Sequence, residues 1–367
     1  MKLGIICHAN FGGSGVIATE LGLAFAARGH DVHFICEHAP PRLVAAQNVT
    51  LHEVKAPAHP LFPQGEYALA LASKLAEVVG RHGLDLLHVH YAIPLAISAH
   101  LARELLGNRA PKLVVTVHGT DVLTLGQDPA FKPIVRHALL HSDAITAPSR
   151  FLAKAAHEGF ELGDKPVEVV SNFVDTRRFA PAARSFTPKT LTHNSNFRSL
   201  KRVQDVVRIF ERVRREVPCE LVLIGDGPER AAVEALVHAS GLQAHVRFLG
   251  EVVDVVPWLQ RSDVFLMPSE IESFGLAALE AMSCGVPVVA SRTGGLPEVI
   301  THASTGFLHP VGDLDAMAQS TTQLLQDAAL HRQMSLSARA ACLERFELAP
   351  IADTWEALYR RLLRNPT

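Results

Sequence analysis

The feature that most constrains this 367-residue chain is a regular alternation of short apolar runs with longer amphipathic runs, which occurs twice. In the first half, helical periodicity fills the segments 15–28, 67–81, 95–106 and 132–141. Strand-like apolar runs flank these segments at 3–7, 32–36, 86–89, 113–117, 144–147 and 167–170. Strands that alternate with helices in this way predict a parallel sheet covered by helices.

The alternation stops at residues 175–189, which carry mixed charge and two prolines, and then starts again. The second series predicts strands at 191–195, 220–224, 246–249, 264–267 and 286–290, and helices at 201–215, 229–239, 275–283 and 314–326. A chain of this length exceeds one hydrophobic core. We therefore predict an α/β protein with two doubly wound, Rossmann-like domains that face a central cleft, since ligands bind outside the carboxyl ends of such strands.

The predicted domains span residues 1–174 and 190–345, with 175–189 as the linker. Residues 346–367 contain a final amphipathic helix that is predicted to cross back to the N-terminal domain.

Composition excludes several classes of protein. The formal net charge of −2 argues against nucleic-acid binding, and no apolar stretch is long enough to span a membrane. The five cysteines show no C-x-x-C spacing, which favours reduced, buried thiols in a cytoplasmic protein. A homo-oligomer is compatible with this sequence.

A glycine-rich loop follows the first predicted strand. Gly12, Gly13 and Gly15 allow the backbone to pass close to a ligand, and the following helix offers N–H groups to a phosphate. The same loop fits G-x-G-x-x-A through Ala18, with Glu37 ending the second strand, as in a nicotinamide-dependent oxidoreductase. The loop is longer than the tight turn of that fingerprint, so the oxidoreductase is the weaker alternative. A glycine-rich turn without a ligand is a further alternative.

Two glutamates stand eight residues apart in the second half. Glu272 belongs to a loop and Glu280 to the helix that opens at Gly275. A carboxylate on the apolar face of that helix is costly without hydroxyl partners, and a ribose diol supplies two. Glu272 would face the hydroxyls of a sugar. The backbone of Ser273, Phe274, Gly275 and Leu276 would hold phosphate oxygens.

The setting of these glutamates, PSEIESFGLAALEAMSCGVP followed by GGLPE, resembles the signature of the retaining glycosyltransferases of family four, which have the GT-B fold. The resemblance covers nearly the whole chain. It implies a nucleotide-diphosphate sugar as donor, with the sugar transferred to a small acceptor and no cofactor. A non-catalytic protein that binds nucleotide sugars is the alternative outside the enzymes.

Further motifs narrow the resemblance within the family. They are GGSGV, HVHYAIP at 88–94, VHGTD at 117–121, SNFVD at 171–175 and SNFRSLKRVQD at 195–205. They resemble the subgroup that transfers N-acetylglucosamine from its UDP donor to the hydroxyl of L-malate, the first step of bacillithiol biosynthesis. An acceptor such as inositol phosphate, used by a related subgroup, remains the alternative.

The resemblance assigns roles to several residues. Lys201 is the family's phosphate lysine, and a lysine at a cleft meets a diphosphate as a point charge. Family members often carry an arginine where this chain has Asn196, so Arg198 is the candidate second cation. His118 is expected beside the donor sugar, and Gly13 and Ser14 beside the phosphates. The catalytic candidates are thus Glu272, Lys201 and His118.

A dicarboxylate acceptor needs convergent donors and at least one cation. Arg136 can offer a bidentate fork. The predicted acceptor-binding residues are Ser14, Lys74, Tyr91, Thr116, Arg136 and Asn172.

Two patterns suggest a metal, and both have simpler explanations. His88 and His90 alternate on one strand but lack a third ligand, and Asp313-Leu-Asp315 is explained by capping of a helix. We therefore predict no metal, and a front-face mechanism in which the leaving diphosphate accepts the acceptor's proton.

Overall fold

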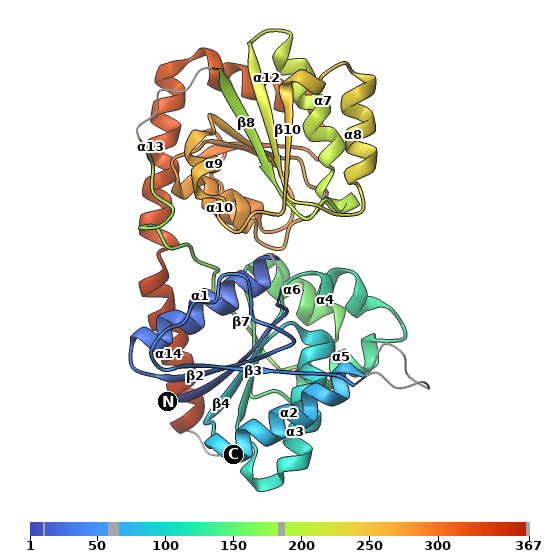
Figure 1. Ribbon diagram of the computed structural model, residues 1–367, viewed down its shortest axis with the longest axis vertical. Helices are drawn as coiled ribbons and strands as arrows, with labels where there is room; N and C mark the ends of the chain where they lie inside the picture. The colour runs from blue at the N-terminus through green and yellow to red at the C-terminus, as the bar shows by residue number, and fades with distance from the viewer. Residues whose placement is uncertain (10–11, 58–65, 183–187, 365–367) are drawn as a thin grey trace. The chain divides into compact units, whose positions relative to one another are not determined.

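The computed structural model describes residues 1–9, 12–57, 66–182 and 188–364. The chain forms two compact units. The first consists of Met1–Ser171 with Ala349–Thr367, and the second of Asn172–Leu348. Figure 1 shows a sheet with helices packed around it in each unit.

The first unit is built on a seven-stranded sheet in the order β3-β2-β1-β4-β5-β6-β7, and every neighbouring pair is parallel. The strands are β1 (Lys2–Ile6), β2 (Asp31–Cys36), β3 (Val49–Glu53), β4 (Leu86–His90), β5 (Lys112–Thr116), β6 (Ala144–Ala147) and β7 (Val167–Val169). β4 is buried throughout, because helices cover both faces of the sheet. All the strands are parallel, so the loops that follow β1, β4 and β5 meet at one edge.

The helices of this unit are α1 (Gly13–Ala27), α2 (Tyr67–His82), η1 (Ala92–Ala96), α3 (Ile97–Leu106), η2 (Gly107–Arg109), α4 (Thr120–Leu123), η3 (Leu125–Gln127), α5 (Lys132–Leu140) and α6 (Arg150–Gly159). The terminal helix α14 (Leu348–Arg364) packs here as well. It buries Trp355 and Tyr359, and the ring of Tyr359 lies 5.3 Å from that of Phe25 on α1.

The second unit has a six-stranded parallel sheet in the order β10-β9-β8-β11-β12-β13. Its strands are β8 (Lys189–Asn194), β9 (Cys219–Ile224), β10 (Val246–Gly250), β11 (Val264–Met267), β12 (Val288–Ser291) and β13 (Gly306–His309). Its helices are η4 (Ser199–Lys201), α7 (Val203–Arg214), α8 (Arg230–Ala239), η5 (Gln243–His245), α9 (Val256–Arg261), α10 (Leu276–Ser283), α11 (Leu296–Val299), α12 (Leu314–Gln326) and α13 (Ala328–Arg345).

The segment predicted as a linker packs on the second unit over its described part. Phe179 is completely buried in that unit's core. The guanidinium of Arg339 donates to the carbonyl oxygens of Phe179 and Thr176, both at 2.8 Å. The division of the chain therefore falls at Ser171, before the predicted boundary at 174, and residues 183–187 lie outside the described part.

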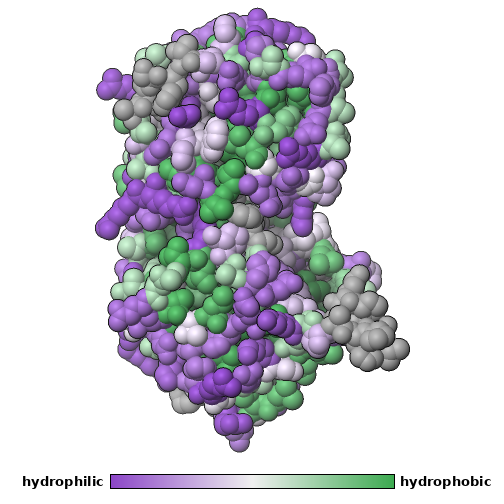
Figure 2. Space-filling model, in the orientation of Figure 1, coloured by the Kyte–Doolittle hydropathy of each residue, from purple (hydrophilic) through white to green (hydrophobic). Residues whose placement is uncertain are grey.

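The visible surface of each unit mixes polar and apolar side chains (Figure 2). Within the described ranges, no helix combines the length and the apolar character needed to cross a membrane.

Candidate active site

The loop that follows β11 carries Glu272, whose side chain is almost completely buried. Its Oε1 accepts a hydrogen bond of 2.6 Å from Nζ of Lys201 and one of 2.8 Å from the hydroxyl of Ser269. The structure therefore brings two of the predicted catalytic residues into direct contact, although 71 positions separate them in the sequence.

Two glycines of the GGLPE motif, Gly294 and Gly295, lie against the backbone of this loop. The backbone N–H of Gly295 donates to the carbonyl oxygen of Glu272 at 2.8 Å. Gly294 has φ of +55°, and a Cβ atom there would lie 1.9 Å from the same oxygen. Position 294 therefore requires glycine, because residues with a side chain rarely adopt this φ and because the carbonyl oxygen of Glu272 occupies the place of a Cβ atom.

α10 begins directly after the Glu272 loop. Glu280 lies on this helix and is 4% exposed. Gly275 precedes the helix with φ of +99°, and Ser273 and Leu276 are half-buried beside it. Phe274 packs in the core against Phe346, so only its backbone is available to a ligand.

The loop of Lys201 is tied to the loop of Glu272 through the backbone. The N–H of Glu270 donates to the carbonyl oxygen of Leu200 at 2.8 Å, which joins the two loops. Within the loop of Lys201, the N–H of Lys201 donates to the carbonyl oxygen of Arg198, also at 2.8 Å. Asn196 and Arg198 lie on this same loop with exposed side chains. The three predicted diphosphate contacts thus share one segment of the second unit.

In the first unit, the loop after β5 is organised by the buried carboxylate of Asp121. It accepts hydrogen bonds from the backbone N–H groups of His118 at 3.0 Å, Gly119 at 2.8 Å and Ala92 at 2.9 Å. Burial raises the pKa of Asp121, while these hydrogen bonds oppose the rise. Asp121 therefore joins the loops that follow β4 and β5, a role that the sequence analysis did not assign.

The ring of His118 stacks on that of Tyr91, with centroids 6.0 Å apart, and its Nε2 lies 3.1 Å from Nδ1 of His90. Tyr91 has φ of +114°, an uncommon backbone conformation that is typical of functional loops. Desolvation by burial, with a smaller contribution from His8, lowers the pKa of His118 to about 3. The imidazole is therefore neutral at pH 7 and offers a hydrogen bond without a charge.

Thr116, a predicted acceptor-binding residue, makes hydrogen bonds within the first unit. Its buried hydroxyl lies 2.6 Å from Nε2 of His88 and 2.7 Å from the hydroxyl of Thr146. The hydroxyl of Tyr359 lies 2.6 Å from the other ring nitrogen of His88. Two of the three hydrogen-bonding positions of the Thr116 hydroxyl are therefore filled by residues of the first unit.

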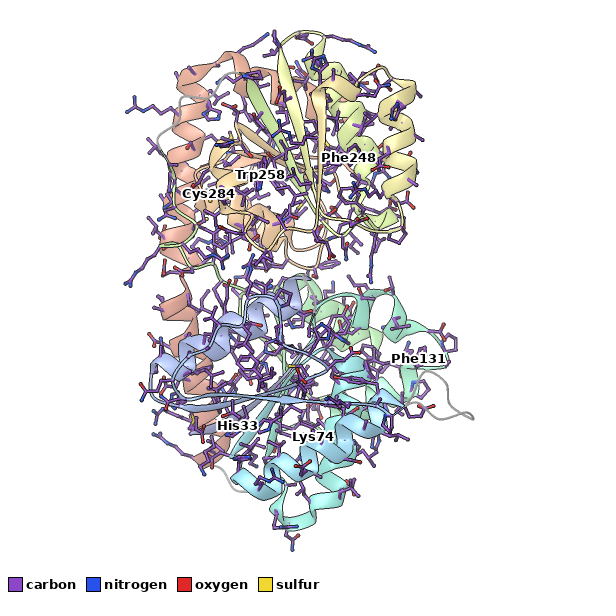
Figure 3. All side chains as sticks on the ribbon, viewed as in Figure 1. His33, Lys74, Phe131, Phe248, Trp258 and Cys284 are labelled. Carbon is purple, nitrogen blue, oxygen red and sulfur yellow. The ribbon has the colours of Figure 1, made fainter. Side chains whose placement is uncertain are left out.

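Arg136 and Lys74, also predicted to bind the acceptor, make contacts within the first unit. The guanidinium of Arg136 donates to the carbonyl oxygens of Phe160 at 2.9 Å and Glu161 at 3.2 Å, at the end of α6. Nζ of Lys74 lies 3.0 Å from a carboxylate oxygen of Glu77, in an open groove of about 700 Å³ that Glu53 and Glu66 also line. Lys55 lines the same groove, which therefore carries both cations and anions. Figure 3 shows Lys74 on α2.

The remaining predicted residues lie at the ends of elements. Gly13 and Ser14 form the first turn of α1, and Asn172 is buried at the start of the second unit. Asn10 and Phe11, within the glycine-rich loop, lie outside the described residues. The side chain of Asp313 accepts the N–H of Ala316, which confirms that this aspartate caps α12.

Comparison with known proteins identifies the family. The profile "Glycosyltransferase Family 4" matches residues 11–178, and "Glycosyl transferases group 1" matches residues 176–341. The chain is 44% identical, over its full length and 98% of the relative, to N-acetyl-alpha-D-glucosaminyl L-malate synthase of Bacillus anthracis. The chain belongs to glycosyltransferase family four.

Two other similarities place this family-four glycosyltransferase more broadly. A GDP-mannose-dependent mannosyltransferase of Corynebacterium glutamicum is 28% identical over 73% of the chain and 74% of that protein. Sucrose-phosphate synthase of Thermosynechococcus elongatus has the same fold, with a TM-score of 0.83, 22% identity and 99% of each chain covered. The predicted GT-B fold is confirmed, and the oxidoreductase alternative is not favoured.

Proposed function

We propose that this glycosyltransferase moves N-acetylglucosamine from UDP-N-acetylglucosamine to the hydroxyl of L-malate with retention of the anomeric configuration, as the first step of bacillithiol biosynthesis. The full-length relationship to a protein named for that product supports the donor and the acceptor. An inositol phosphate acceptor is the alternative. No feature of the described residues favours it over malate.

One observation carries the chemical assignment: the ammonium of Lys201 lies 2.6 Å from a carboxylate oxygen of Glu272. A nucleotide-diphosphate sugar presents phosphate oxygens on one side of the bond that breaks and sugar hydroxyls on the other. The ammonium of Lys201 suits the phosphate oxygens, and the carboxylate of Glu272 suits the sugar hydroxyls. The pair therefore fits the two sides of the bond that breaks. The backbone of Ser273 to Leu276 would bind the diphosphate, and Glu280 would bind the ribose hydroxyls.

The reaction balances without a cofactor. The bond between C1 of the sugar and the β-phosphate oxygen breaks, and a bond from C1 to the malate hydroxyl oxygen forms on the same face. The hydroxyl proton passes to the departing phosphate oxygen. Lys201 stabilises the charge that develops on UDP, which is the electrostatic role expected of a cation fixed in a site without a metal.

The first unit would supply the acceptor site. Neutral His118 can hydrogen-bond to the sugar without adding a charge, and Tyr91 stacks on the ring of His118. The first turn of α1, with Gly13 and Ser14, would hold an anionic group by its backbone N–H groups. The proposal does not depend on Thr116 or Arg136, whose polar groups make hydrogen bonds within the first unit.

We place the enzyme in the cytoplasm, without a metal or an organic cofactor in its reaction. The five cysteines are buried as free thiols, which is compatible with a reducing compartment.

The test is release of UDP from UDP-N-acetylglucosamine with and without L-malate, in buffer that contains EDTA, with the product's anomeric proton followed by NMR. Malate-dependent release and an α-linked product support the proposal. Release only with inositol phosphate, or only from GDP-mannose, would retain the family and remove the substrate assignment. Release that stops in EDTA and returns with a divalent cation would overturn metal independence.

A further inference from the structure

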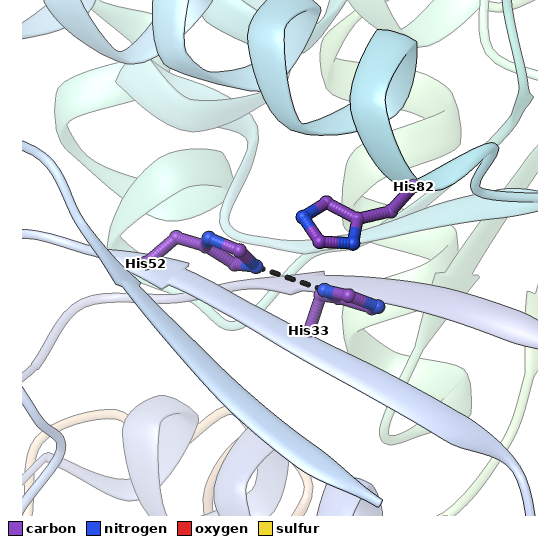
Figure 4. A group of neighbouring side chains, drawn as sticks. All are labelled: His33, His52 and His82. Atoms are coloured by element: carbon purple, nitrogen blue, oxygen red, sulfur yellow. Dashed lines mark hydrogen bonds between the residues drawn. The ribbon is translucent and has the colours of Figure 1, made fainter.

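Three histidines meet on one face of the first unit's sheet, apart from the residues used above. His33 lies on β2, His52 on the edge strand β3, and His82 is the last residue of α2. The register places His33 opposite Thr50, two residues before His52, so both histidines project from the same face. Figure 4 shows the three rings gathered where the end of α2 crosses these strands.

The geometry is close to that of a metal centre. One ring nitrogen from each histidine lies within 4.8 Å of the other two, and Nδ1 of His33 is 2.8 Å from Nε2 of His52. Nitrogen ligands around tetrahedral zinc, at 2.0–2.1 Å from the ion, are about 3.3 Å apart. The contact between His33 and His52 would lengthen by about half an ångström to reach that spacing, and the nitrogen of His82, which lies within 4.8 Å of both, would have to come to the same spacing.

The surroundings of His33 favour one ligating nitrogen. Its Nε2 lies 3.3 Å from a carboxylate oxygen of Asp31 without hydrogen-bond geometry, and its Nδ1 lies 2.8 Å from His52. Histidines that bind metals commonly direct their second nitrogen at a carboxylate, which fixes the tautomer and leaves the other lone pair for the ion. His33 is 2% exposed, whereas His52 and His82 are half-buried and give access from solvent.

Charge does not prevent binding at this place. Desolvation lowers the pKa of His33 and lowers that of His52 to about 4, so both rings are neutral ligands at pH 7. Lys2 and Lys74 act on these rings with positive charge, and Asp31 and Glu77 act with negative charge.

We propose that His33, His52 and His82 form a binding site for a divalent transition metal of the zinc class, with water in the fourth position. Three imidazoles suit zinc, copper and nickel rather than magnesium or calcium. Among the described residues, no other group of three potential ligands has this geometry. The ion would join β2, the edge strand β3 and the end of α2.

The site would stabilise the first unit and leave sugar transfer unchanged. His82 ends the helix that leads to the amino end of β4, whereas His118 follows the carboxyl end of β5. The ion would therefore sit toward the opposite edge of the sheet from the candidate active site.

The experiment uses the full chain, stripped of metal and titrated with Co²⁺ for the visible absorption of a tetrahedral centre and with Zn²⁺ for thermal stability. We expect one ion per chain at the site, a higher Tm with Zn²⁺, and at least tenfold weaker binding in His52→Asn and His82→Asn. Both substituted residues are half-buried, so these variants are expected to fold even if His33→Asn does not.

Two histidine variants serve as controls. His137→Asn alters a second cluster, where the rings of His137 and His141 lie 4.1 Å apart, and His157→Asn alters an exposed helix position. Both should bind Co²⁺ as the unmodified protein does. Equal affinity in all variants, loss of binding in His137→Asn alone, or no absorption and no Tm shift would overturn the proposal.

Discussion

Replacing Gly294 by alanine tests whether the GGLPE turn sets the position of Glu272. The added Cβ would lie 1.9 Å from the carbonyl oxygen of Glu272, and real Cβ atoms do not approach closer than 3.0 Å, so one of the two must move by about 1.1 Å. A shift of the Glu272 carbonyl displaces the side-chain carboxylate of the same residue, which contacts Lys201. A displacement of about 1 Å can cost roughly 10²-fold in rate, so we expect kcat/KM to fall about a hundredfold.

The matched control is Gly241→Ala in the same unit. Gly241 has φ of +69°, close to the +55° of Gly294, but no atom lies within 4 Å of its added Cβ. Both variants lose roughly 1–2 kcal/mol of stability from the left-handed backbone, and only Gly294→Ala also distorts the site. The contrast between them therefore isolates the contact with Glu272 from the cost of the backbone conformation.

The assay is malate-dependent UDP release at a temperature where both variants are folded, with thermal unfolding measured in parallel. We expect Gly241→Ala to keep the unmodified kcat/KM within about threefold, a change worth less than 1 kcal/mol of transition-state stabilisation. If Gly294→Ala also keeps its rate, the turn does not position Glu272. If both variants lose activity equally, the effect is one of stability.

Three further outcomes follow from other contacts. Lys201→Met removes the cation beside Glu272, so we expect kcat to fall by roughly 10²–10³-fold while the chain stays folded. A kcat within fivefold of that of the unmodified enzyme would contradict the proposal that Lys201 stabilises the departing UDP. Tyr359→Phe leaves a buried ring nitrogen of His88 without its hydroxyl partner. We therefore expect the free energy of unfolding to fall by about 1–3 kcal/mol and Tm to decrease, with little change in kcat. An unchanged Tm would show that this hydrogen bond does not contribute to stability. Burial lowers the pKa of His88 to about 3 and that of His193 to about 4, so both stay neutral in the folded protein below pH 6.5 while the unfolded chain takes up protons. As the pH falls below 6.5, the free energy of unfolding should therefore decrease by about 1.4 kcal/mol per pH unit for each histidine, until the pH reaches the pKa of that histidine in the folded protein. Urea unfolding that is independent of pH between 7 and 5 would refute this.

The sequence predicted what depends on local pattern. Apolar alternation located the strands of both sheets except β3 and β13. β3 was not predicted because its residues, VTLHE, lie at an exposed edge of the sheet and do not form an apolar run. The buried residues of α13, Met334, Ala338 and Cys342, form a stripe too narrow to mark its helical period clearly.

Side-chain partners from distant segments could not be predicted in the same way. Thr116 is an ordinary strand residue until the fold brings His88 and Thr146 to its hydroxyl. Arg136 has the right charge for an acceptor, but its helix lies against the end of α6. The three histidines of the proposed metal site come from two strands and a helix, with no motif spacing to reveal them.

Asp121 in the first unit and Glu272 in the second are both buried carboxylates, but their hydrogen-bond partners are of different kinds. Asp121 binds backbone N–H groups, which cannot leave without breaking the loops that carry them. Glu272 binds the side chains of Lys201 and Ser269, which can rotate away or accept a new partner while the backbone stays in place. A substrate hydroxyl can therefore replace a partner of Glu272 but not one of Asp121. By this criterion Asp121 fixes the loops that follow β4 and β5, and the partners of Glu272 are the kind that the proposed sugar hydroxyls could replace.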